Sequence, residues 1–304
     1  MTVAATHPDR TGQDLPTPRE PMACDYPAPS LTLLGLEPVR AALEYFGARL
    51  MDRSSLPAGD GHPVVLFPGL AADKTCLGPL RKLCEELGYV AYDWGRGFNT
   101  GPTGDVDDWI AELGSHVQSV ACLHEQKVSL IGWSLGGIYA REIARLMPDA
   151  VRQVITLGTP FAGDGDATNV GWIYRVLSGQ PAKLDDALSR RLRSTPPVPT
   201  TSVFSRSDGV VAWQACQEPR ERAQAENVEV EGSHVGLVWH PKVWSVVADR
   251  LAQPEGGWRP YRDPRDAAND APVAPVAPVV LDETAGLAAL ATARMSARVG
   301  RLAA

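Results

Sequence analysis

Three side chains of types that act together in nucleophilic catalysis are spread along this chain: Ser134, Asp208 and His234. A serine hydroxyl is a poor nucleophile near neutral pH, so it needs a histidine as general base, and the histidine needs a carboxylate that orients its ring. Ser134 lies in the pentapeptide GWSLG at 132–136, and the other two residues each follow a predicted strand. These residue types indicate attack of a serine on an acyl carbonyl.

The segment KVSLIGWSLGGIYAREIARL at 127–146 predicts a buried strand, a tight turn and a helix in succession. Apolar residues recur at helical spacing after the turn, at Ile138, Ile143 and Leu146. In a G-x-S-x-G turn the serine occupies a strained apex, and bulky side chains two residues away on either side would collide with neighbouring backbone. The alternative is a glycine-rich turn in which Ser134 is an ordinary helix N-cap.

With this motif between a strand and a helix, the chain resembles the α/β-hydrolase superfamily, in its lipase and esterase branch. The resemblance covers roughly residues 62 to 252, and it implies the chain order Ser, Asp or Glu, His, each in a loop after a strand. Ser134 would then be the nucleophile, Asp208 the orienting acid and His234 the base. No metal or organic cofactor is implied.

The resemblance also implies an oxyanion hole made of two backbone N–H groups. One belongs to Leu135, directly after the nucleophile, and the other to Leu70, in the loop after the first core strand. Many lipases carry His-Gly in that loop, whereas this chain has Phe-Pro-Gly at 67–69, so the donor there stays open. Among the side chains, we expect Trp133, Trp172 and Tyr174 to contact the substrate.

The acid and the base each have an alternative. His240 lies six residues beyond His234, at the start of the last predicted helix, and is the fallback base. Asp208 precedes a glycine that would let the backbone turn the carboxylate toward the imidazole, although Asp-Gly is also a common surface turn. Asp164 and Asp166, one strand earlier, are the alternative acids.

The elements that must position these residues alternate between strand and helix, which predicts an α/β fold with a doubly wound, mostly parallel sheet of about six strands. Strands are predicted at 63–67, 89–94, 128–131, 150–157, 200–204 and 227–230, and helices at 36–51, 75–87, 105–124 and 241–251. The first helix is amphipathic, with Val39, Leu43, Phe46 and Leu50 along one stripe. Ligands of such sheets bind beyond the carboxyl ends of the strands.

The segment 161–199 interrupts this alternation with an aromatic patch and a charged helical stretch at 184–192. An insertion of this length between core strands is usually functional or disordered. We expect a small helical cap over the site, the alternative being a surface excursion.

Outside the predicted hydrolase domain at 31–258, we expect a disordered segment at 1–30 and a Pro- and Ala-rich tail at 259–304. The formal net charge of −7 gives no electrostatic reason to expect a nucleic-acid partner. The N-terminus has no apolar signal core and the chain has no transmembrane run, so a cytoplasmic location is expected.

The sequence thus predicts a serine carboxylic-ester hydrolase of esterase or lipase type that acts on a small or lipid-like ester. Two alternatives remain: an acyltransferase with the same three residues, and a catalytically silent binding module of the same fold. Acyl chain length, leaving group and oligomeric state are left open.

Overall fold

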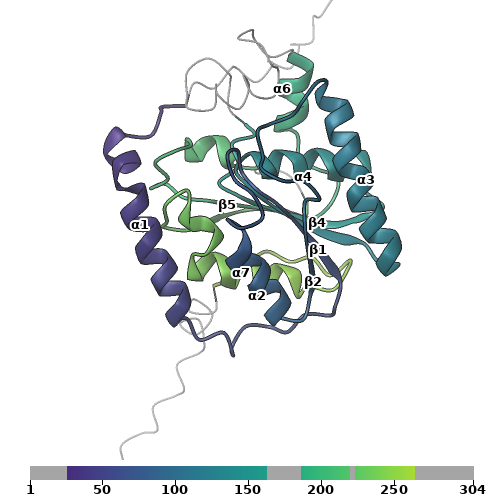
Figure 1. Cartoon of the computed structure of the whole chain (residues 1–304), viewed down its shortest axis with the longest axis horizontal. Coiled ribbons are helices and arrows are strands. Elements are labelled where there is room, and N and C mark those ends of the chain that lie inside the picture. The colour runs from purple at the N-terminus through teal and green to yellow at the C-terminus, as the bar shows by residue number, and fades with distance from the viewer. Residues whose placement is uncertain (1–25, 163–185, 220–222, 264–304) are drawn as a thin grey trace, which may run out of the picture. The chain divides into compact units, whose positions relative to one another are not determined.

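The computed structural model describes residues 26–162, 186–219 and 223–263 (Figure 1), and its centre is a six-stranded sheet in which every neighbouring pair is parallel. Its strands are β1 (Pro63–Phe67), β2 (Val90–Asp93), β3 (Val128–Trp133), β4 (Val151–Leu157), β5 (Thr200–Phe204) and β6 (Ala225–Glu229). They lie in the order β2-β1-β3-β4-β5-β6. This arrangement confirms the predicted fold class, and the loops after β3, β5 and β6 emerge at one edge.

Helices cover both faces of the sheet, because each strand alternates its side chains between two hydrophobic clusters. Val65 and Phe67 pack on one face with α3 (Val106–His124) and α4 (Leu135–Leu146). Val64 and Leu66 pack on the other with α2 (Gly78–Glu86) and α7 (Pro241–Leu251). The described part of the chain also contains the helices α1 (Leu31–Leu50) and α6 (Asp186–Arg193) and the short 3₁₀ turns η1 (Trp213–Cys216) and η2 (Gly236–Val238).

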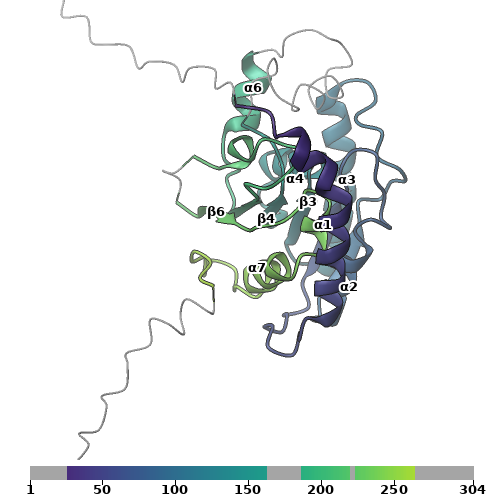
Figure 2. The same cartoon turned by 90° about the vertical axis from the view of Figure 1, so that its left-hand side faces the viewer.

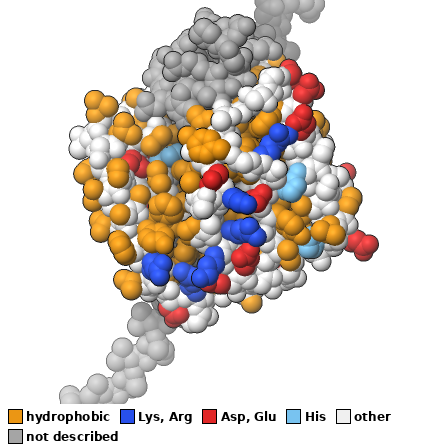
Figure 3. All heavy atoms as spheres, in the orientation of Figure 1, with side chains coloured by type: hydrophobic (Ala, Val, Ile, Leu, Met, Phe, Trp, Pro, Cys, Tyr) orange, Lys and Arg blue, Asp and Glu red, His pale blue; other side chains and the backbone are white. Residues whose placement is uncertain are grey.

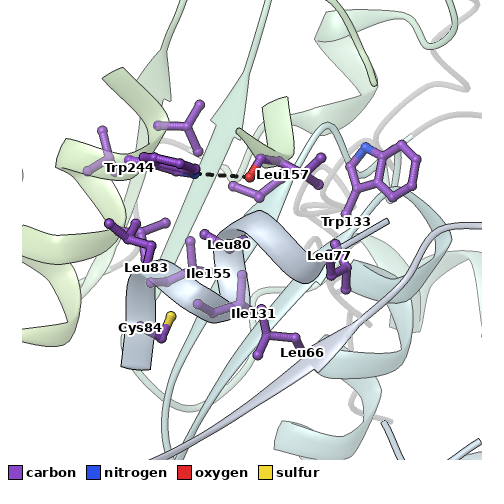
Figure 4. Close-up of a cluster of buried hydrophobic side chains, with 14 of the residues drawn as sticks. Leu66, Leu77, Leu80, Leu83, Cys84, Ile131, Trp133, Ile155, Leu157 and Trp244 are labelled. Atoms are coloured by element: carbon purple, nitrogen blue, oxygen red, sulfur yellow. Dashed lines mark hydrogen bonds between the residues drawn. The ribbon is translucent and has the colours of Figure 1, made fainter. Parts of the chain in front are cut away.

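The cluster beneath α2 and α7 extends to the edge of the sheet where β3 ends (Figure 4). Ile131 and Trp133 of β3 lie beside Ile155 and Leu157 of β4, and all four are at least 92% buried. The indole N–H of Trp244 donates to the carbonyl of Val238 at 3.0 Å, which ties α7 to η2. Trp133, the residue before Ser134, is therefore anchored in the core.

The helix α1 is longer than predicted and presents its apolar stripe to solvent. An apolar stripe normally faces the core, but Val39, Leu43, Phe46 and Leu50 are 59 to 87% exposed. Figure 3 shows hydrophobic side chains on the surface on the side of the molecule where α1 lies. The buried positions of α1 are Glu37, Ala41 and Ala48. Figure 2 shows α1 running beside α7, with η2 also packed against it. Polar contacts with two loops, described below, explain which face of the helix turns inward.

The described residues up to Tyr261 belong to one compact unit, and Arg262 and Asp263 open a second unit at 262–304. Several predictions fall on residues outside the described part of the chain. These are the substrate contacts of Trp172 and Tyr174, the alternative acids Asp164 and Asp166, and most of the predicted cap. Within the described part of the chain, no helix has both the length and the apolar character needed to span a membrane.

Candidate active site

Ser134 sits at the apex of a strained turn between β3 and α4. Its backbone has φ 53° and ψ −123°, a region that residues other than glycine rarely occupy. A Cβ added at Gly132 would lie 2.3 Å from the Cα of Gly137, and one at Gly136 would lie 2.2 Å from the carbonyl oxygen of Phe67. Both glycines are thus required by close backbone approach, as the spacing predicts.

Asp208 and His234 meet at the carboxyl edge of the sheet. Nδ1 of His234 lies 2.7 Å from Oδ2 of Asp208, and both side chains are almost fully buried. The other carboxylate oxygen accepts hydrogen bonds from the N–H groups of Val210 and Val211, both at 2.8 Å, so the acid is fixed in orientation. This leaves Nε2 as the ring nitrogen that can face a nucleophile.

The charges around His234 favour its protonated form. Burial by itself lowers the pKa of His234, but the charge of Asp208, its hydrogen bond and the charge of Glu37 together raise the pKa above its ordinary value. An imidazole that holds a proton in this way suits a base that must stabilise its own cation during the reaction.

Two contacts hold the loop that carries His234, called the base loop below, close to the turn that carries Ser134. The indole N–H of Trp133 donates to the carbonyl of His234 at 3.0 Å, and the two rings lie 5.6 Å apart. Gly158, at φ 55°, faces the imidazole so closely that a Cβ there would lie 3.1 Å from Nδ1. The described hydrogen bonds include none between Ser134 Oγ and His234, and such catalytic contacts often tighten only when substrate binds.

Trp133 has a structural contact that the sequence does not reveal. Its side chain is only 8% exposed and belongs to the core cluster beneath α7. Together with the hydrogen bond to His234, this favours a role in holding the base loop, while its predicted contact with substrate stays a prediction.

The loop after β1 lies against the start of α4, where the oxyanion hole is expected. A Cβ on Gly69 would lie 3.1 Å from Cβ of Ser134. Leu135 is the first residue of α4, where backbone N–H groups have no intrahelical acceptor. The described hydrogen bonds likewise include no acceptor for the N–H of Leu70. Both predicted donors therefore belong to segments in contact near the serine.

Asn99 supports this loop, and sequence reasoning missed it. The side chain is fully buried, and its Nδ2 donates to the carbonyl of Pro68 at 2.8 Å. Its backbone exchanges hydrogen bonds with the loop, receiving one from Ala71 N and giving one to the carbonyl of Ala72, both 2.8 Å long. No local sequence pattern marks this residue, because its partners at Pro68, Ala71 and Ala72 are brought to it only by the fold.

Gly209 is needed for a different reason than the sequence suggested. It does not adopt a positive φ, so it provides no special turn. A Cβ at this position would instead lie 2.6 Å from the carbonyl carbon of Leu33, because the first turn of α1 packs directly on it. Close approach of α1 to the acid loop is the physical reason for this glycine.

The other described histidines have structural partners. His240 is the N-cap of α7, and its Nδ1 accepts from the N–H of Lys242 at 3.1 Å. His116 lies 2.9 Å from the carbonyl oxygen of Asp93, and His124 lies 2.8 Å from the hydroxyl of Tyr92. Among the described residues, the geometry favours His234 over His240 as the base.

Comparisons with known proteins agree with the fold. The model of the alpha/beta hydrolase family matches residues 64–303. The polyketide synthase ThaQ of Burkholderia thailandensis is 29% identical in an alignment of length 249, which covers 70% of this chain and 12% of that protein. The pimeloyl-[acyl-carrier protein] methyl ester esterase of Shewanella woodyi is 28% identical over 137 residues, 44% of this chain and 51% of that protein.

Among solved structures, Aspergillus fumigatus lipase B superposes with a TM-score of 0.53 at 18% identity, covering 86% of this chain and 65% of the lipase. The chain spans about half of the curated esterase and an eighth of the synthase that it matches. The family match covers most of the chain, and the chain belongs to the alpha/beta hydrolase family.

Proposed function

We propose that the protein is a serine carboxylic-ester hydrolase that acts through Ser134, His234 and Asp208. The observation that carries this proposal is a strained serine at the carboxyl end of β3, with a buried imidazole–carboxylate pair held to the neighbouring tryptophan at the same edge. A turn strained in this way is maintained by close glycine packing, which a simple helix N-cap does not need.

The reaction would proceed through an acyl-enzyme. Nε2 of His234 takes the hydroxyl proton as Oγ of Ser134 bonds to the acyl carbon, and Asp208 stabilises the imidazolium. The backbone N–H groups of Leu135 and Leu70 donate to the oxyanion. The imidazolium then protonates the departing alkoxide. Water, deprotonated by the same imidazole, then attacks the acyl-enzyme and forms a second tetrahedral intermediate. When this intermediate breaks down, the imidazolium returns the proton to Oγ of Ser134 and the carboxylic acid is released.

A series of p-nitrophenyl esters from acetate to palmitate tests the substrate class. We expect turnover of short to medium apolar acyl groups and none by Ser134→Ala. Trp172→Ala should change chain-length preference and KM more than stability, if the predicted cap contacts the acyl chain. Lack of turnover across the series would remove the carboxylesterase proposal.

A second candidate is hydrolysis or transfer of an acyl group delivered by a carrier protein. It is favoured by two of the curated relatives, one named as a polyketide synthase and one as an esterase of pimeloyl-[acyl-carrier protein] methyl ester. The same serine would attack a thioester or ester carbonyl. Turnover of an acyl-pantetheine thioester faster than the matched p-nitrophenyl ester, and product formation on an added alcohol or thiol, would favour this candidate.

A further inference from the structure

Three polar side chains of α1 point inward onto the two loops that carry the proposed acid and base. They lie at positions 37, 40 and 44, which share one side of a helix. Arg40 donates to the carbonyl and hydroxyl oxygens of Ser207, at 2.5 and 2.7 Å. Glu44 accepts from the N–H and hydroxyl of Ser233, at 2.8 and 2.5 Å. Each contact falls on the residue that immediately precedes Asp208 or His234.

Glu37 joins both loops through a single carboxylate. Its Oε1 accepts from the N–H of Gly209 at 2.9 Å and from the N–H of His234 at 3.0 Å, while Oε2 accepts from Val235 at 3.3 Å. The residue is 5% exposed. A buried charge needs partners of this kind, and hydrogen bonds to a carboxylate are stronger than neutral ones. A single oxygen atom, Oε1 of Glu37, therefore holds the backbone of both Gly209, which follows Asp208, and His234.

The geometry points to Glu37 as a positioning residue, which sets the separation between the Asp208 carboxylate and the His234 imidazole through the backbone of their loops. This inference rests on the proposed function, because it assigns Glu37 a part in the same reaction. Other described hydrogen bonds between the loops end at Gly232. Ser205 Oγ donates to its carbonyl at 2.6 Å, its N–H donates back to Ser205 Oγ at 3.1 Å, and Ser207 Oγ donates to the same carbonyl at 3.4 Å. Those contacts lie further from the reacting groups.

Glu37 affects His234 through its charge as well as through its hydrogen bonds. It lies against the backbone of His234 and favours the imidazolium, together with Asp208. Titratable or charged groups of the described chain lie on the loop of His234 and on the elements packed against that loop. They are Glu37, Arg40, Glu44, Asp208, Glu231 and His240. Of these, Asp208 and Glu37 act directly on the imidazole.

The test compares Glu37→Gln, Glu37→Asp and the control Val39→Ala in the full-length protein. Val39 lies on the same helix and is 59% exposed, so its truncation reports effects on the helix itself. For Glu37→Gln we expect kcat to fall about 10- to 100-fold, as when outer partners of metal-bound groups are removed. KM should change little, since the loss falls on the transition state. Glu37→Asp keeps the charge and should recover part of kcat.

A second measurement needs no activity. The pKa of the His234 imidazole, followed by NMR, should fall in Glu37→Gln and stay near the wild-type value in Glu37→Asp and Val39→Ala. If Glu37→Gln fails to fold, the kcat of Glu37→Asp decides. The shorter side chain should lower kcat below the wild-type value, and a kcat equal to that of the wild type would overturn the inference. A lowered melting temperature with unchanged kcat and unchanged imidazole pKa would also overturn it.

Labelling of wild-type Ser134 by a fluorophosphonate separates this inference from the proposed function. If the wild type is not labelled, the serine-hydrolase proposal fails, and the imidazole pKa alone judges Glu37. If the wild type is labelled and Glu37→Gln labels at the wild-type rate, the proposed function stands and the role of Glu37 is rejected.

Discussion

Nε2 of His62 lies 2.7 Å from Oγ of Ser129, and Nδ1 of the same ring lies 2.5 Å from Asp60. The chain therefore contains a second Ser-His-Asp group, at the amino ends of β1 and β3. With about 3.3 Å per residue in a strand, Ser129 lies about 16 Å along β3 from Ser134. Ser129 is fully buried within the strand, while Ser134 occupies the strained turn. Residue types alone therefore do not distinguish the proposed nucleophile from Ser129, whereas position on the sheet does.

We expect Ser129→Ala to keep esterase activity and fluorophosphonate labelling while it destabilises the fold. The substitution leaves the buried Nε2 of His62 without its hydroxyl partner. It also removes one of two acceptors of the Gln153 side-chain amide, which donates to Ser129 at 3.2 Å and to the carbonyl of Arg250 at 3.1 Å. A loss of about 1–3 kcal/mol in the free energy of unfolding is typical of such a change. Urea denaturation and labelling of the same sample measure both quantities. Loss of labelling in a Ser129→Ala variant of unchanged stability would indicate that Ser129, rather than Ser134, is the nucleophile.

His234→Ala and His240→Ala should separate catalysis from helix capping. His234→Ala removes the proposed base, so turnover should nearly vanish. His240→Ala removes the side-chain cap of α7 and should reduce stability by about 1 kcal/mol with most turnover retained. Steady-state kinetics with thermal melts of both variants are sufficient. The opposite pattern would make His240 the base.

Asn99→Ala should lower kcat with little change in KM, because Asn99 holds the loop that carries the proposed Leu70 donor. The loss should be smaller than the about 10²–10³-fold that follows removal of an oxyanion donor itself. The matched control is Lys74→Ala, because Lys74 is an exposed residue in the loop after β1, the same loop that contains Leu70. Equal kcat in wild type and Asn99→Ala would remove Asn99 from the support of the site.

The raised pKa of His234 predicts opposite pH trends for activity and stability. The base must be neutral, so kcat/KM should rise as pH increases through the folded-state pKa. A raised folded-state pKa contributes stability that is fully present below the unfolded value of about 6.5 and is lost as pH rises through the folded value. Asp208→Asn should move the acidic limb of the kcat/KM profile to lower pH and reduce its height. An acidic limb that does not move would show that Asp208 does not control this imidazole.

Local sequence patterns were sufficient for most of the fold. The strands at 63–67 and 200–204 and the helix at 241–251 end at the predicted residues, because each is a short apolar run or a periodic stripe bounded by polar residues, Pro or Gly. The exposed stripe of α1 was not predictable in this way. Its orientation depends on polar contacts such as that between Glu37 and His234, which are 197 residues apart.

The candidate site divides along the same line. The turn at Ser134 follows from a local spacing, so sequence reasoning identifies it. The supporting residues Asn99, Gly158 and Glu37 find their partners only after the chain has folded, and no local pattern marks them. Gly209 was singled out, but its reason, contact with the backbone of α1, lies in tertiary packing.

The most direct test of the account is the site of covalent labelling. Wild-type protein and Ser134→Ala are each treated with a fluorophosphonate, and intact-mass and peptide mass spectrometry locate the adduct. The account predicts one adduct on the peptide containing Ser134 in the wild type, and none in the variant at an unchanged melting temperature. Ester turnover with an adduct on another residue, or undiminished labelling of Ser134→Ala, would contradict it.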